Sequence, residues 1–223
     1  MSPIPNEHLT RPLPYYRIIK RLIDLIIASA SLILLAPLLI LIAVLIWIDS
    51  RGPALFKQQR IGLDGKPFTF YKFRSMKIDT DPLGFSPSHQ DDPRLTRIGQ
   101  ILREWSLDEL PQLFNVIRSE MSLVGPRPLL PWQYERWTSR QRQRLLVKPG
   151  MTGWAQVHGR AEVAHDAKIE LDLHYVQQAS VGLDLRIIWT TITQNLGRSR
   201  IYETNYYGTG PENSPNNNSR EIM

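Results

Sequence analysis

The sequence predicts an α+β fold, mostly helical, in which an N-terminal membrane helix precedes a polar, basic domain. The first observation is an apolar run from Leu22 to Ile48 with one charged residue, Asp24; about twenty consecutive apolar residues are typical of a membrane segment. The second is the aromatic-rich stretch Phe68–Met76, which predicts a small β element. The third is helical spacing of apolar residues later in the chain, which predicts amphipathic helices.

The composition suits anionic partners. The 223 residues carry a formal net charge of +6 and contain no cysteine. A basic chain attracts phosphates, nucleic acid or acidic lipid headgroups, and the absence of cysteine excludes disulfides and cysteine metal sites. We expect a polar segment (residues 1–15), a membrane helix (16–50), a catalytic domain at the cytosolic face (51–203) and a disordered tail (204–223).

The apolar run is long enough to span a membrane. From Asp24 to Ile48 a helix would reach roughly 36 Å, which exceeds the roughly 30 Å of hydrocarbon in a bilayer. A cleaved signal peptide is the weaker alternative, because the small residues Ala28-Ser29-Ala30 lie inside the run instead of after it.

Two features of the same run favour a helix that enters and leaves on one side. Lysine and arginine flank both ends, which is typical of cytoplasmic flanks on both sides. Pro37 lacks a backbone donor and is expected to kink or break the helix. Two half-helices of about twelve residues would each reach roughly 18 Å, enough for one leaflet. The physics alone leaves spanning and re-entry equally open.

Past this run, the strand predicted at Phe68–Met76 places Lys72 and Arg74 on one face. The alternative is an ordinary solvated face. Apolar residues at helical spacing predict two amphipathic helices, near residues 95–105 and 185–196. We expect interfacial amphipathic helices, the first with Trp105 as an anchor in the lipid; packing on the core, the default for most amphipathic helices, is the alternative.

The adjacent carboxylates Asp108 and Glu109 are the strongest chemical signal. Ser106 and Glu109 have the spacing of a capping box, which is the structural alternative. Pro111 favours the first turn of a helix, so the carboxylates should lie just before a helix N-terminus. Two neighbouring carboxylates can share Mg²⁺ or divide the roles of nucleophile and base.

A second signal is Arg127, which stands between Pro126 and Pro128. Because each proline restricts the backbone, a rigid turn would present one guanidinium, as a phosphate-binding site needs. An exposed arginine in a proline-rich turn is the alternative. The glycine-rich segment Lys148–Gly153 follows, and there the backbone can approach a ligand closely.

Five segments together occur in the order and spacing of one family: Lys72–Met76, Asp92–Arg94 with Thr96–Gly99, Ser106–Gln112, Ser122–Pro128 and Pro149–Arg160. The chain resembles the bacterial sugar transferases, which are monotopic phosphoglycosyl transferases, over roughly Tyr16 to Tyr202. It is most similar to their minimal catalytic form, without an additional bundle of transmembrane helices.

The resemblance implies a re-entrant helix that breaks near Pro37. It implies transfer of a sugar-1-phosphate from a UDP-sugar to polyprenyl (undecaprenyl) phosphate, with UMP released and Mg²⁺ as cofactor. Asp108 would be the nucleophile that forms a covalent phosphosugar intermediate, and Glu109 the partner carboxylate, both in contact with the metal. Substrate or phosphate binding is expected, on the same basis, at Lys72, Arg74, Arg94, Arg127, Arg160 and Asp172.

Two residues depart from the family pattern. Ala36 precedes Pro37 where serine is common, and His158 stands where asparagine is common. The implied location is the cytoplasmic face of the bacterial inner membrane, with anionic lipids as further partners and no nucleic acid. A membrane phosphatase acting on polyprenyl substrates and a basic membrane tether are the competing functions. The sugar, the polyprenol, the glycan pathway and a homodimer stay open.

Overall fold

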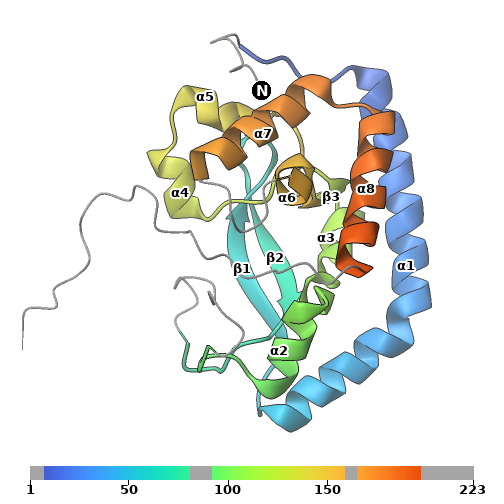
Figure 1. Cartoon of the computed structure of the whole chain (residues 1–223), viewed down its shortest axis with the longest axis vertical. Helices are drawn as coiled ribbons and strands as arrows, with labels where there is room; N and C mark the ends of the chain where they lie inside the picture. The colour runs from blue at the N-terminus through green and yellow to red at the C-terminus, as the bar shows by residue number, and fades with distance from the viewer. Residues whose placement is uncertain (1–7, 81–91, 159–164, 197–223) are drawn as a thin grey trace, which may run out of the picture.

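The computed structural model describes residues 8–80, 92–158 and 165–196, and shows the mostly helical α+β fold that the sequence predicts (Figure 1). The helices are α1 (Pro14–Asp49), α2 (Arg97–Glu104), α3 (Gln112–Ile117), α4 (Pro131–Arg136), α5 (Ser139–Arg142), α6 (Trp154–His158), α7 (His165–Gln178) and α8 (Val181–Leu196). The strands are β1 (Leu55–Ile61), β2 (Pro67–Phe73), β3 (Ser122–Val124) and β4 (Gly150–Thr152), and short 3₁₀ turns are η1 (Leu63–Gly65), η2 (Leu107–Glu109) and η3 (Gln143–Leu146).

Helix α1 is long and apolar enough to cross a membrane, by length and composition. It runs through Pro37 without interruption, so the expected break is instead a bend within one helix. Figure 1 shows α1 following α8 and then changing direction toward α2. Proline is a common cause of such a bend, because it removes one backbone hydrogen bond and crowds the preceding turn.

Both arms of α1 pack on the catalytic domain. Ala28 of the first arm lies in a core cluster with Phe68 and Phe70 of β2. Further along, Ile42 and Ile46 join a cluster with Phe73 of β2 and Leu102 of α2. Since the two arms are packed on either side of Pro37, tertiary contacts support the bend that the proline allows.

Charged residues near the start of α1 also contact the domain. The buried carboxylate of Asp24 accepts a hydrogen bond from the Leu123 backbone N–H at 3.1 Å. Lys20 pairs with Asp184 of α8 at 2.7 Å, and Arg21 donates to carbonyls at the end of α3. Two of the basic residues that suggested a cytoplasmic flank therefore also attach α1 to the domain.

Two small sheets organise the rest of the domain. Strands β1 and β2 form an antiparallel hairpin whose register pairs Leu55 with Phe73 and Ile61 with Pro67. Strands β3 and β4 pair in parallel. The second pairing joins Ser122–Val124 of the fourth family-like motif to Gly150–Thr152 of the fifth.

The two predicted amphipathic helices correspond to α2 and α8. Leu102 of α2 is buried in the core, whereas Trp105 at its end is 44% exposed. On α8 Asp184 and Ile187 are buried, and the predicted stripe points outward at Leu185, Trp189 and Ile192. Helix α2 therefore packs on the core, and contact of either helix with lipid stays a prediction.

Candidate active site

The carboxylates Asp108 and Glu109 lie in turn η2, directly before α3. The predicted location before a helix N-terminus is correct, with Pro111 as the N-cap of α3. The capping box is wrong, because Ser106 adopts a left-handed conformation (φ 55°) and its side chain accepts no capping hydrogen bond. The sharp turn at Ser106 instead directs the chain so that Asp108 is buried, with 5% of its surface exposed.

Burial raises the pKa of Asp108 to about 6. The ammonium of Lys72 acts in the opposite direction, Glu109 raises the pKa further, and Arg103 and Arg127 lower it. Desolvation disfavours a charged carboxylate, and nearby cations favour it. Asp108 is therefore ionised for the most part near neutral pH, but with a higher proton affinity than an exposed aspartate.

Glu109 behaves differently from its neighbour. Burial acts to raise its pKa, but the charge and hydrogen bond of Arg127, together with Lys72 and Arg103, outweigh burial and lower it. Arg127 pairs with Glu109 at 3.0 Å. Glu109 is thus the carboxylate held by a cation, and it stays ionised over a wider pH range than Asp108.

Lys72 lies near the end of β2 and acts on both carboxylates. Burial lowers its pKa, and the charge of Asp108 opposes this shift. Its ammonium also lies 5.5 Å from the centre of the Phe56 ring. The charge of Lys72 thus acts on both carboxylates, and its predicted role in binding phosphate stays a prediction.

Arg74 does not share the surroundings of Lys72. Strand β2 ends at Phe73, and the Arg74 guanidinium bonds to the backbone carbonyl and hydroxyl of Ser50 and the carbonyl of Arg51. The expectation that both cations point the same way is therefore wrong. Arg74 is buried and fixes the chain at the end of α1.

Arg103 is a site residue that the sequence analysis did not select. It lies in the last turn of α2, and its charge acts on Lys72, Asp108 and Glu109. The helical pattern places Arg103 on a polar face of the helix but does not show which residues that face contacts. Its position five residues before Asp108 is the signal that could have identified it.

Arg127 reaches Glu109 from the turn after β3. The turn lies against β4, where the Gly125 N–H donates to the Thr152 carbonyl at 2.8 Å and the Gly150 N–H to the Pro126 carbonyl at 2.9 Å. A Cβ at Gly150 would lie 2.0 Å from the Gly125 nitrogen. Glycine is required here because the two backbones approach so closely.

Arg94 and Asp172, which were also predicted to bind substrate, are each paired with another side chain. Arg94 forms a bidentate ion pair with Asp92, with N–O distances of 2.9 and 2.7 Å. Asp172 of α7 is 3% exposed and pairs with Arg144 at 2.5 Å; burial raises its pKa to about 6, and Arg144 lowers it. Asp172 is therefore joined to a buried arginine instead of opening toward substrate. Arg160 lies outside the described residues.

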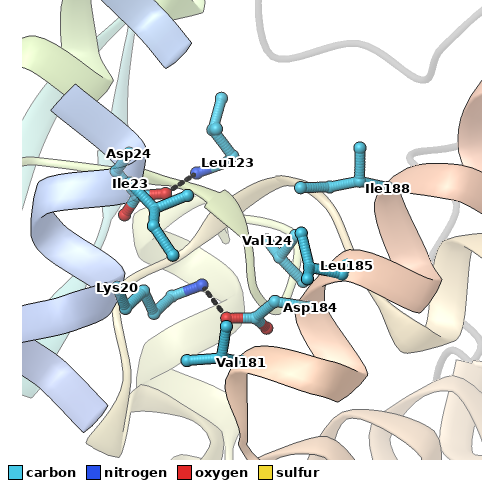
Figure 2. A pocket seen from close by; sticks show the side chains of 9 residues that line it. All are labelled: Lys20, Ile23, Asp24, Leu123, Val124, Val181, Asp184, Leu185 and Ile188. Atoms are coloured by element: carbon cyan, nitrogen blue, oxygen red, sulfur yellow. Dashed lines mark hydrogen bonds and ion pairs between the residues drawn. The ribbon is translucent and has the colours of Figure 1, made fainter. Parts of the chain in front are cut away.

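A small pocket lies apart from this site, between α1, β3 and α8 (Figure 2). Its charged residues are Lys20, Asp24 and Asp184, and Lys20 is already paired with Asp184 at 2.7 Å. Two carboxylates against one ammonium do not suit a phosphate. These side chains join α1 to the domain.

A buried carboxylate beside several cations is typical of enzymes that act on phosphorylated substrates, because such chemistry depends on positioning and charge neutralisation. The comparisons with known proteins agree. The chain belongs to the bacterial sugar transferase family, whose profile matches residues 15–198. The family resemblance drawn from the five motifs is therefore confirmed.

Individual relatives cover the chain to different extents. The chain is 43% identical over 190 residues to the uncharacterized sugar transferase EpsL of Bacillus subtilis, covering 85% of this chain and 93% of the relative. It is 40% identical over 194 residues to the UDP-glucose:undecaprenyl-phosphate glucose-1-phosphate transferase of Escherichia coli, covering 83% of this chain and 42% of the relative. It is 42% identical over 187 residues to the UDP-N-acetylgalactosamine-undecaprenyl-phosphate N-acetylgalactosaminephosphotransferase of Aeromonas hydrophila. That match covers 81% of this chain and 44% of the relative. The chain thus spans less than half the length of these last two relatives.

Proposed function

We propose that this chain transfers a sugar-1-phosphate from a UDP-sugar to a polyprenyl phosphate, expected to be undecaprenyl phosphate, and releases UMP. The Escherichia coli and Aeromonas hydrophila relatives are named for this type of transfer, with glucose and N-acetylgalactosamine respectively. Because the chain is about equally identical to both relatives, experiment must determine which sugar it transfers. The reaction would be the first membrane step in the assembly of exopolysaccharide, O-antigen or another glycan.

The observation that carries the proposal is the environment of Asp108. Its carboxylate is buried, and the charges of Lys72, Arg103 and Arg127 act on it. Within the described part of the chain, no ion pair occupies this carboxylate. A buried carboxylate that is surrounded by cationic side chains, without an ion pair to any of them, can attack phosphorus because it is ionised and keeps lone pairs available.

The proposed reaction has two steps. An oxygen of Asp108 attacks the sugar-bearing phosphorus of the UDP-sugar; a bond to Asp108 forms, the bond to UMP breaks, and UMP leaves with the electron pair. A phosphate oxygen of polyprenyl phosphate then attacks the same phosphorus and releases the Asp108 carboxylate. Arg127 and Arg103 would neutralise charge on the phosphates, which is the main requirement of phosphoryl transfer.

We expect Mg²⁺ to bind at Asp108 and Glu109. Mg²⁺ is usually coordinated by one or two carboxylates together with substrate phosphates and water. Two adjacent acidic side chains match this preference. Over residues 8–80, 92–158 and 165–196, no cluster of three or more His, Cys, Asp or Glu side chains offers a metal site made by protein alone. When bound, the ion would supply additional neutralisation of the phosphate charge.

The lipid acceptor and helix α1 both favour catalysis at a membrane surface. Large apolar side chains stay exposed along both arms of α1, including Ile26, Ile33, Leu34, Ile40 and Trp47. We propose that α1 enters and leaves the cytoplasmic leaflet of the bacterial inner membrane, with its bend at Pro37 inside the lipid. The basic domain would then lie against anionic headgroups, which attract cationic surfaces. A homodimer stays a prediction.

One assay tests the function and separates it from its alternatives. Purified protein is incubated with Mg²⁺, a panel of radiolabelled UDP-sugars and undecaprenyl phosphate. We expect UMP and a lipid-linked sugar diphosphate with one or a few of the sugars. Release of inorganic phosphate from the polyprenyl phosphate would instead indicate a phosphatase, and absence of both products would indicate a membrane tether.

A further inference from the structure

Arg127 combines an exposed side chain with a firmly held backbone. Its guanidinium side chain is 56% exposed where it pairs with Glu109. An exposed arginine normally samples many rotamers, so its usefulness for binding phosphate depends on where the backbone holds it. The segment from Pro126 to Leu129 shows how the backbone is held.

Four successive carbonyls in this segment each accept a hydrogen bond, and the donors come from three other parts of the chain. The donors are the Gly150 N–H to Pro126 (2.9 Å), Arg144 Nη2 to Arg127 (2.8 Å), Arg60 Nη1 to Pro128 (3.2 Å) and the Ile61 N–H to Leu129 (2.8 Å). The carbonyl of the functional residue itself is thus held by a side chain, Arg144. A change at Arg144 can therefore move Arg127 without altering the β3–β4 or β1 backbone contacts.

Arg144 is in turn fixed by Asp172. The two form an ion pair at 2.5 Å in which their side chains are 5% and 4% exposed. The Arg144 guanidinium also lies 4.8 Å from the centre of the Trp137 ring. A buried, charge-paired and stacked guanidinium has little freedom, so the hydrogen bond that it donates to Arg127 is directed.

We propose that Asp172 and Arg144 are positioning residues of the transferase, which act by holding the Arg127 carbonyl so that the Arg127 side chain meets Glu109 and the substrate phosphates. Asp172 then contributes to the reaction from α7 without touching substrate. The inference rests on the proposed function, because it assigns these residues to the same reaction.

The test replaces the whole pair, so that no buried charge is left alone. In the variant Arg144→Met/Asp172→Leu, apolar side chains of similar size occupy the two positions, and such exchanges of buried ion pairs are often tolerated. The matched control is Arg140→Gln/Glu170→Gln. That pair joins α5 and α7 at 2.6 Å with side chains 28% and 47% exposed, so it lies in solvent where the Arg144–Asp172 pair is buried.

The first measurement is kcat/KM for the UDP-sugar in the transferase assay. We expect the pair variant to lose about tenfold to a hundredfold, because small displacements of a positioning group have effects of that order. The control variant should stay within about twofold of wild type. With Arg127→Gln already present, replacing the pair should cost less than about twofold more, because the residue through which the pair acts is gone.

The second measurement does not depend on activity. The chain has no cysteine, so Arg127→Cys can carry a single spin label. Its electron paramagnetic resonance spectrum should show greater mobility when the Arg144–Asp172 pair is replaced and no change with the Arg140–Glu170 control. The spin-label spectrum also tests the positioning role of the pair if Arg127→Gln turns over too slowly for a kinetic comparison.

The proposal is overturned if the pair variant keeps wild-type kcat/KM, if its loss multiplies fully with that of Arg127→Gln, or if the label at position 127 is equally ordered in all backgrounds. A fully multiplying loss would indicate direct contact between Asp172 or Arg144 and substrate. Failure of the transferase function itself looks different, since wild-type protein would then release no UMP, whereas the spin-label result would stand unchanged.

Discussion

Asp108 and Asp172 are two buried aspartates with opposite arrangements of partners. Their exposed fractions are 5% and 3%, and burial raises both pKa values to about 6. Asp172 is bound directly by Arg144 at 2.5 Å. Asp108 instead has Lys72, Arg103 and Arg127 acting on it from around the site, and within the described residues none of them forms an ion pair with it.

The difference shows how burial alone fails to identify a nucleophile. A carboxylate with a direct partner is stabilised in place and has little reason to react, whereas one that is only surrounded by cations keeps its lone pairs available. A perturbed pKa is therefore informative only when it is considered together with the contacts of the carboxylate. We expect Asp108 to act as the nucleophile and Asp172 to hold Arg144, and through it Arg127, in position.

The largest expected effect is on activity at Asp108. Asp108→Asn keeps the shape of the side chain but cannot form the covalent intermediate, so we expect kcat to fall by about 10³-fold or more. UMP release from the UDP-sugar, with circular dichroism to verify folding, checks this result. Turnover above roughly a tenth of wild type would remove Asp108 from the nucleophile's role.

The second prediction contrasts the two aspartates by stability. Asp172→Ala leaves the buried Arg144 without its acceptor, so we expect a loss of about 3 kcal/mol in the free energy of unfolding. The raised pKa of Asp108 means that its ionised form is disfavoured in the folded state, a cost that grows as the pH rises from about 4 to 6. Asp108→Asn should therefore leave stability at pH 8 unchanged or raise it by on the order of 1 kcal/mol.

Denaturant titration of both variants at pH 8 measures this contrast. Equal destabilisation by the two substitutions would mean that Asp108 is also held by a structural partner, and the distinction between the two sites would be lost.

A smaller effect is expected in the pH dependence. Because the ionised carboxylate is the proposed nucleophile and its pKa in the free protein is about 6, kcat/KM should fall about tenfold per unit below that pH and level off above it. The charge of Lys72 lowers this pKa, so Lys72→Met should move the midpoint to higher pH. A midpoint that is the same in both proteins would indicate that another group controls the rate.

Much of the fold followed from local patterns. The apolar run predicted residues 16–50 as one element, and α1 spans Pro14–Asp49. Aromatic alternation predicted β2, and Pro111 correctly indicated a helix start directly after the two carboxylates. These features depend on residues near one another in the sequence, so local sequence patterns predict them.

The errors arise where tertiary structure determines direction. The face of α2 that carries Arg103 is directed at the carboxylates by packing of Leu102 against β2 and α1. Arg74 turns away from Lys72 because β2 ends at Phe73, and Ser106 adopts a left-handed turn that no pattern signals in a non-glycine residue. Such features depend on contacts between distant segments.

The most direct test of the central claim is the mass of the intact protein. Wild-type protein is incubated with Mg²⁺ and the UDP-sugar that the assay identifies, but without polyprenyl phosphate. We predict release of one UMP per protein and addition of one sugar-phosphate, located at Asp108 by peptide mapping and absent from Asp108→Asn. An unmodified protein that releases UMP only when polyprenyl phosphate is present would contradict the covalent mechanism and indicate direct transfer between the two substrates.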